Sequence, residues 1–147
     1  MAYPRAQVIL EGYKTPNGPK LLPQGGAGAL YNVVGGRIEL RQIVGRVTTA
    51  IQNQANNTKI QIHPSGQAAI DICAVTSIIN FAVGQLVGIT GLETDALLAG
   101  LALKAQTTRW IVPVGTIDLN CLASSSGALT WLLRWMPIDA GAFVTPA

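Results

Sequence analysis

Residues that could perform acid–base or nucleophilic chemistry are few in this sequence. The 147-residue chain has one histidine, His63, which stands just before Pro64 at the end of an alternating apolar and polar run. A general base must lie within hydrogen-bond reach of the group that it deprotonates. Because no serine or cysteine motif accompanies His63, we expect it to be a surface or turn residue rather than a catalytic one.

The acidic residues form no obvious cluster along the chain. Glu93 and Asp95 are close in sequence, but they follow Gly91 in a segment typical of a loop, and a calcium loop needs a longer run of alternating oxygen ligands. Two carboxylates from distant strands could still form a glycosidase pair, an alternative that the sequence leaves open. We predict no catalytic residue and no metal ligand. The seven acids are Glu11, Glu39, Asp71, Glu93, Asp95, Asp118 and Asp139.

Neither the glycines nor the cysteines form a cofactor motif. The glycine-rich stretch at residues 25–28 lacks the Lys-Ser/Thr pair of a phosphate loop, so a flexible connection is expected there. Cys73 and Cys121 have no zinc or redox spacing and lie among apolar neighbours, which favours buried, reduced thiols. The sequence therefore predicts no cofactor.

Three tryptophans could form a platform on which a sugar ring stacks. They are Trp110, Trp131 and Trp135. Trp131 and Trp135 alternate with Leu129 and Leu133 on the apolar side of one expected strand, opposite polar or charged residues such as Arg134. This pattern favours a place in the core over a sugar site.

The composition predicts a protein that works within an assembly. Only 12% of the residues are charged and 49% are hydrophobic, whereas about a quarter of an average soluble domain is charged. Much of the exterior must then be uncharged, as in a chain whose surface is covered by neighbours. We therefore expect an obligate or near-obligate oligomer. The net charge of +3 is spread out, and Glu39 dilutes the set of Arg37, Arg41 and Arg46, so a solvated strand face is favoured and no nucleic-acid partner is expected.

Proline, glycine and alternation divide the chain into an arm and one domain. Residues 1–35 hold four of the eight prolines and are expected to form an extended N-terminal arm, with short strands only at residues 7–10 and 29–34. Residues 36–147 alternate with period two over several short runs, among them residues 37–40, 59–63, 116–121 and 129–135. The fold class that this predicts is all-β, a jelly-roll-like β-sandwich.

Three local features of the expected domain need comment. The apolar phase slips between Leu40 and Ile43, which predicts a β-bulge or break near Arg41 and Gln42. Residues 94–106 fit either a short helix or a strand with its loop. Residues 72–92 carry no charge, but their polar residues and three glycines argue against a membrane span.

The first 22 residues lack a continuous apolar core, so no signal peptide is expected, and assembly in a cytoplasm fits.

Several segments between residues 36 and 144 form a pattern of strands and turns without a catalytic motif. They are the strand at 36–51, the Lys-x-x-x-x-Pro turn at 59–64, the Gly-x-x-x-x-Ile-Thr-Gly element at 84–91, and the closing stretches at 115–119 and 126–144. This pattern resembles the small capsid decoration, or cement, proteins of tailed bacteriophages.

The resemblance implies a structural virion protein that binds the capsid exterior as a homodimer or homotrimer, bridges major capsid subunits and is assembled in the host bacterial cytoplasm. Contacts would be made through the arm and exposed strand edges, with the amphipathic side chains of Tyr3, Arg5 and Tyr13 as candidate capsid or subunit contacts. A tail or baseplate subunit is the first alternative. A carbohydrate-binding module is the second, and it would require exposed tryptophans.

Overall fold

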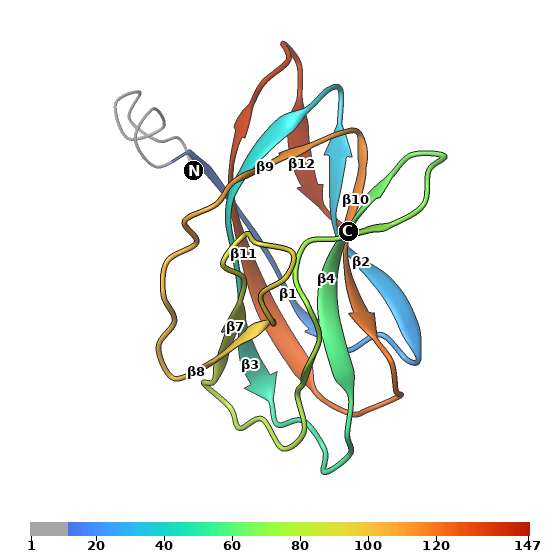
Figure 1. The fold of residues 1–147 in the computed structure, drawn as a ribbon, viewed down its shortest axis with the longest axis vertical. Helices are drawn as coiled ribbons and strands as arrows, with labels where there is room; N and C mark the ends of the chain where they lie inside the picture. The colour runs from blue at the N-terminus through green and yellow to red at the C-terminus, as the bar shows by residue number, and fades with distance from the viewer. Residues whose placement is uncertain (1–11) are drawn as a thin grey trace.

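The protein folds as two antiparallel β-sheets packed face to face (Figure 1). A computed structural model describes residues 12–147, and these contain no helix. One sheet, here called sheet A, has the strand order β1 (Tyr13–Leu21), β11 (Ala128–Pro137), β3 (Ile38–Thr49), β7 (Leu86–Gly88) and β8 (Leu98–Gly100), with β9 (Trp110–Val112) also beside β3. Sheet B has the order β12 (Phe143–Pro146), β2 (Gly26–Val34), β10 (Gly115–Cys121), β4 (Asn57–Pro64) and β5 (Ile70–Asp71), with β6 (Thr76–Ser77) also beside β4.

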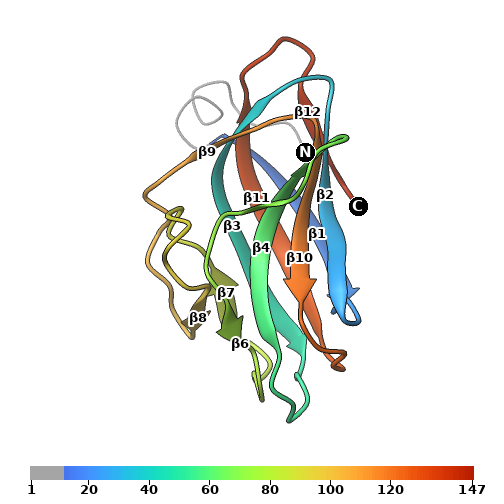
Figure 2. The ribbon, with the colours of Figure 1, turned by 45° about the vertical axis from the view of Figure 1, so that its right-hand side comes forward.

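The strand order is that of a jelly roll. Successive long strands alternate between the sheets, so that β1 and β3 lie in sheet A while β2 and β4 lie in sheet B (Figure 2). The chain then returns, and β10 inserts between β2 and β4 just as β11 inserts between β1 and β3. This double Greek key confirms the predicted jelly-roll-like β-sandwich.

Period-two alternation places the core between the sheets. In β11, Leu129, Trp131, Leu133 and Trp135 are buried, whereas the residues between them are only half-buried. In β10, Ile117, Leu119 and Cys121 face the same core from sheet B. Side chains on a strand point alternately to its two faces, so the apolar set of each long strand is buried in a single layer.

The predicted bulge in β3 is present. Arg134 lies opposite Gln42 and Trp135 opposite Leu40, which leaves Arg41 as the extra residue. Leu40 and Ile43 on either side are buried, while Arg41 and Gln42 are both half-buried. The bulge therefore lets the core face accept Leu40 and Ile43 although they are three positions apart.

The predicted arm of residues 1–35 is wrong for residues 13–34. These residues form β1 and β2, which belong to the same sandwich as residues 36–147. Pro16 and Pro19 could not occupy a central strand because they lack an N–H group, but among the described strands β1 lies at the sheet edge and pairs with β11 alone. The expected strand at residues 29–34 is found within β2, and that at residues 7–10 lies outside the described residues.

The uncertain segment at residues 94–106 forms a strand with its loop. Leu98–Gly100 pair with β7 as β8, and the residues around them are turns and irregular chain. Residues 72–92 hold the short strands β6 and β7 joined by turns. No helix in residues 12–147 has the length and apolar character needed to cross a membrane.

Both open sides of the sandwich are closed by hydrogen bonds between the sheets. On one side, the Asn17 side-chain amide donates to Leu30 O at 2.6 Å and Lys20 Nζ donates to Ala29 O at 2.9 Å, which joins β1 to β2. On the other side, Leu97 N donates to Ala74 O at 2.9 Å and Thr76 Oγ1 donates to Leu97 O at 2.9 Å. These bonds protect the long strand edges against pairing with another chain.

Candidate interaction surface

An apolar row crosses the outer face of sheet A. The residues that lie in register across five of its six strands are Pro16, Leu132, Val44, Gly88 and Leu98. Leu132, Val44 and Leu98 are half-buried and Pro16 is exposed. Leu103 packs over Gly88 so closely that an added Cβ would stand 2.9 Å from Leu103 Cδ1. We call these five residues and Leu103 the outer row; its members Leu132, Val44 and Leu98 leave part of their aliphatic surface exposed on the outer face of sheet A.

Basic residues flank the outer row. Lys14 lies opposite Arg134 in one neighbouring cross-strand row, and Arg46 lies opposite Thr130 in the other. Arg41 and Arg109 reach the same face through their ion pairs with Glu39. Neither Arg46 nor Arg134 makes an ion pair with any residue from 12 to 147.

The charge of this face is strongly one-sided. The residues described there comprise five cations (Lys14, Arg41, Arg46, Arg109 and Arg134) and one carboxylate, Glu39, a net charge of +4 that exceeds the +3 of the whole chain. Glu39 Oε1 accepts from Arg41 Nε at 2.9 Å and from Arg109 Nη1 at 3.0 Å. The hydrogen bond from Arg41 is the main reason why the pKa of Glu39 lies below its usual range.

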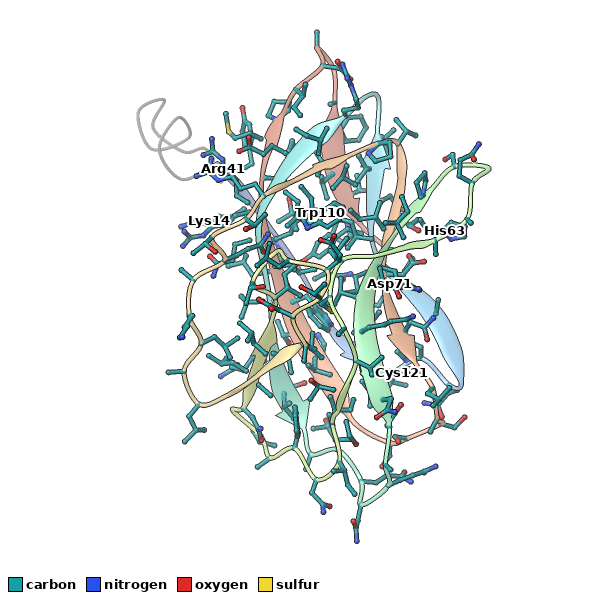
Figure 3. The ribbon with its side chains drawn as sticks, in the orientation of Figure 1. Lys14, Arg41, His63, Asp71, Trp110 and Cys121 are labelled. Carbon is teal, nitrogen blue, oxygen red and sulfur yellow. The ribbon has the colours of Figure 1, made fainter. Side chains whose placement is uncertain are left out.

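The outer face of sheet B is polar, and its side chains bond one another. Lys59 Nζ and Gln61 Nε2 donate to the two oxygens of Asp71 at 2.9 and 2.7 Å, and Asn120 Nδ2 donates to Gln61 Oε1 at 3.0 Å. The hydrogen bond from Gln61, followed by that from Lys59, lowers the pKa of Asp71. Figure 3 shows Asp71 and His63 toward one side of the molecule, and Lys14 and Arg41 toward the other. The polar groups of the sheet B face thus largely satisfy one another.

His63 and Asp118 form the most catalytic-looking pair in the described part of the chain. His63 Nδ1 lies 3.6 Å from Asp118 Oδ2, and Asp118 Oδ1 is buried without a hydrogen-bond partner. A carboxylate behind an imidazole could orient a general base, but such a base needs a nucleophile within reach. Ser65 and Thr116 line the same shallow depression, of about 210 Å³, yet no hydrogen bond joins either of them to His63. His63 is half-exposed in the solvent at a strand end, as the sequence predicted.

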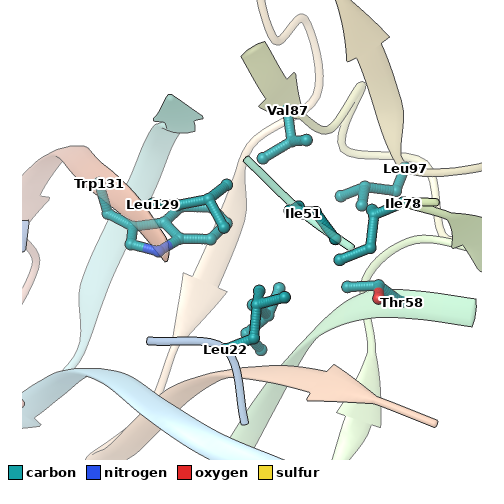
Figure 4. A pocket seen from close by; sticks show the side chains of 9 residues that line it. Leu22, Ile51, Thr58, Ile78, Val87, Leu97, Leu129 and Trp131 are labelled. Carbon is teal, nitrogen blue, oxygen red and sulfur yellow. The ribbon is translucent and has the colours of Figure 1, made fainter. Parts of the chain in front are cut away.

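Neither of the other two cavities described among residues 12–147 is an enclosed small-molecule site. The void within the core has a volume of about 10 Å³ and is lined by apolar side chains such as Ile51, Leu97 and Trp131 (Figure 4). It is far below the several hundred Å³ of a ligand pocket. An open depression of about 470 Å³ lies at the end of the sandwich between Leu21, Gln52 and Ser126, and no charged residue lines it.

The predicted contact residues are only partly described. Tyr3 and Arg5 lie outside residues 12–147. Tyr13 begins β1, is 40% exposed, and stacks on Trp135 with ring centroids 5.0 Å apart. Trp135 Nε1 in turn donates to Thr15 Oγ1 at 2.9 Å. Tyr13 therefore covers the margin of the core, with part of its ring left open to a partner.

The tryptophans and cysteines are placed as the sequence predicted. Trp131 is 1% exposed and Trp135 6%, and both belong to the core. Trp110 is half-buried and donates its indole N–H to Gly91 O at 2.7 Å. Cys73 and Cys121 are free and buried, and burial raises the pKa of both thiols. The tryptophan faces that a sugar would stack on are thus largely covered.

Sequence reasoning missed the outer row and its cations as a surface. The signal was the second set of each alternating strand: Leu132 and Arg134 lie between the core residues of β11, and Val44 and Arg46 between those of β3. Which of these residues become neighbours depends on strand pairing across more than 80 positions of the chain. The alternation predicts which residues point outward, but it does not predict which of them are neighbours on adjacent strands.

Comparison with known proteins gives no relative for this chain. No family model matches it, and no curated protein or solved structure is similar to it.

Proposed function

We propose that this protein is a structural virion component that binds the outer surface of a tailed-phage capsid as an oligomer and stabilises the shell by bridging major capsid subunits. The resemblance of residues 36–144 to decoration proteins suggests the assembly. The jelly-roll sandwich agrees with that resemblance, because the fold serves as a rigid body that presents faces and loops. In the cell, the chain would be made and assembled in the host cytoplasm.

One observation carries the proposal: the surface of the folded domain is poor in charge and rich in exposed apolar side chains. Fourteen large apolar or aromatic side chains of the described residues are exposed, with Leu101 at 86% and Leu21 at 79%, in a chain with only 12% charged residues. Single exposed apolar residues are ordinary on a monomer, but their number together with the low charge is typical of a surface that neighbours cover.

The proposed mechanism is avidity. An oligomer that contacts several capsid subunits converts each later contact into an intramolecular event, so modest contacts add up to firm attachment. Many copies on the shell would then resist outward pressure by holding neighbouring subunits together. The partners in this proposal are the major capsid protein and further copies of this chain.

Immunogold electron microscopy of virions from cells that carry the gene tests the proposal. We expect antibodies against the purified protein to label the heads densely and over their whole surface. Label confined to the tail or baseplate would instead establish the alternative of a tail subunit. The absence of label from all particles would overturn the virion assignment altogether.

The sugar-binding alternative has a separate and simple test. Titration of the protein with a panel of mono- and oligosaccharides should leave the tryptophan fluorescence unchanged, because Trp131 and Trp135 are in the core and Trp110 is half-buried. Saturable quenching by one sugar would revive the carbohydrate-binding module.

A further inference from the structure

We infer that the outer face of sheet A is the docking surface of this protein and that its partner is an acidic protein surface with aliphatic side chains at its centre. The inference deepens the proposed function and rests on it, because it names the capsid-facing side and the chemistry of the capsid surface that receives it. It also implies that the outer face of sheet B points away from the shell.

The charge of the outer face of sheet A favours an acidic partner. Among the described residues, five cations lie around the outer row with one carboxylate, Glu39, which is already bonded to Arg41 and Arg109. Arg46 and Arg134 make no ion pair with any of residues 12–147, so a negatively charged partner would supply a counter-ion to both.

The outer row is the second feature that indicates the partner. It runs across five of the six strands of sheet A between the two sets of basic residues, and its members Leu132, Val44 and Leu98 are only half-buried. An apolar centre ringed by polar groups is the usual anatomy of a protein–protein interface. A nucleic acid would present phosphates at the centre of the contact and leave these aliphatic side chains without an apolar partner, so a protein surface is the better match.

The positive charge of this face disfavours a second copy of the chain bound through the same face. A two-fold contact brings identical patches together, so each net charge of +4 would meet another of +4. Like charges juxtaposed in an interface disfavour association. Self-association must therefore use another surface of the molecule.

Two other surfaces of the described domain, the outer face of sheet B and the seams between the sheets, are less suited to docking. The sheet B face already bonds its own Lys59, Gln61 and Asp71 side chains to one another. The seams between the sheets are closed by Asn17 and Lys20 on one side and by the Ala74–Leu97 and Thr76–Leu97 bonds on the other. Docking through side chains of the sheet A face therefore fits the structure better than the addition of a strand at an edge.

The test compares two pairs of substitutions that each remove two positive charges or add two negative ones. Arg46→Gln with Arg134→Gln changes the sheet A face, where neither side chain has an ion pair to lose. Ala27→Glu with Gln67→Glu makes the same change in net charge at exposed positions on the sheet B side. Thermal unfolding followed by circular dichroism should show that both pairs fold as the unmodified protein does.

The probe is the capsid purified from cells that carry the gene and stripped of this chain. We expect the Arg46→Gln, Arg134→Gln protein to bind at least about tenfold more weakly than the unmodified protein, and the sheet B variant to bind normally. Raising the salt from about 0.1 M to about 1 M, which shortens the Debye length from about 10 Å to about 3 Å, should weaken the unmodified protein more than the arginine variant.

A third variant tests the apolar centre. Leu132→Thr with Val44→Thr keeps residues that favour strands but removes aliphatic surface from the outer row. It should weaken capsid binding while leaving the salt dependence unchanged. Affinity equal to that of the unmodified protein would contradict a role for the outer row.

The outcomes separate this inference from the proposed function. If all variants bind capsids as the unmodified protein does, the face is wrong while the function stands. If the unmodified protein binds no capsid, both the proposed function and the inferred partner are wrong. If mixed-sequence duplex DNA binds as tightly as capsids and depends on the same arginines, the partner is a nucleic acid and the inference of an acidic protein surface is overturned.

Discussion

At the scale of single residues, three surface carboxyl groups, those of Asp139, Glu39 and Asp71, accept hydrogen bonds from basic side chains. Asp139 accepts three hydrogen bonds from Arg37, from its backbone N at 2.8 Å, from Nε at 2.9 Å and from Nη2 at 2.8 Å. The side-chain hydrogen bonds from Arg37 hold the pKa of Asp139 well below its usual range, and the pKa values of Glu39 and Asp71 are lowered in the same direction. These pairs join turns and strands at the surface, where water screens them.

The lowered pKa values predict acid sensitivity. The folded protein keeps these carboxyl groups ionised when the unfolded chain, with carboxyl pKa values of about 4, takes up protons. Their stabilisation is therefore complete above about pH 5 and is lost as the pH falls through the folded pKa values. In urea unfolding between pH 7 and pH 2, Asp139→Asn should lower stability at neutral pH and reduce the acid-induced loss. Glu93→Gln, at an exposed site without an ion pair to a described residue, is the control.

A glycine in the core predicts a packing effect. A Cβ on Gly45 would lie 2.8 Å from Trp131 Cζ3 and 2.9 Å from Val87 Cγ2, within a buried part of β3. Gly45→Ala should therefore lower the free energy of unfolding by about 1–3 kcal/mol because the core must be overpacked. Gly26→Ala in β2, where nothing lies within 4 Å, is the matched control in the same denaturant titration. Equal stability of the two variants would contradict the close packing of Trp131 on β3.

At the scale of the elements, the bulge in β3 decides which side chains reach the two faces. Because Arg41 is the extra residue, Leu40 and Ile43 both enter the core while Arg41 and Gln42 remain on the outer side. Gln106 completes this place in the sheet: its Oε1 accepts from the Ile43 N–H at 3.3 Å, between the stretches of β3 that pair with β9 and β7. The bulge thus serves both the core and the basic outer face.

Two deletions of equal length test the role of the bulge. Removal of Arg41 should restore a regular alternation and leave Leu40 and Ile43 both inward, so the protein should fold with a loss of about 1–3 kcal/mol. Removal of Val44 should shift one half of β3 by one residue and turn its core side chains outward, which should abolish cooperative unfolding. Similar circular dichroism melts for both proteins would argue against a defined bulge at Arg41.

At the scale of the whole molecule, the surface is ordinary in area and unusual in chemistry. The accessible surface is 7271 Å², close to the roughly 7,200 Å² expected of a compact monomer of this mass. The chain therefore buries its core without help from a partner. The low content of charged residues is a property of the surface that the folded chain exposes. The outer face of sheet A is cationic and apolar, whereas the polar side chains on the outer face of sheet B hydrogen-bond to one another.

The native mass is the whole-molecule prediction. Light scattering after size exclusion, repeated across a dilution series, should give the mass of a dimer or trimer that persists at low micromolar concentration, because a poorly charged surface favours association. The Arg46→Gln, Arg134→Gln variant should have the same mass, since the sheet A face is not the contact between copies. A monomer at all concentrations would remove the avidity mechanism.

The sequence by itself determined the fold class, the main core strands and the bulge. Trp131 alternates with Leu129 and Leu133, and the apolar phase slips between Leu40 and Ile43; both are local signals that any strand of this fold must obey. It also marked His63 as a strand-end residue and the two cysteines as buried. Local periodicity records which side of a strand is apolar, and this much is independent of the partner strand.

Only the tertiary structure decided which strands pair and what surface they form. Residues 13–34 looked irregular because their prolines and glycines weaken strand propensity, yet pairing with β11 and β10 makes them strands, since edge positions tolerate proline. The outer row likewise exists only because Val44 meets Leu132 from the far end of the chain. Such neighbours are fixed by the burial of the opposite faces in one shared core, a property of the whole sandwich rather than of any segment.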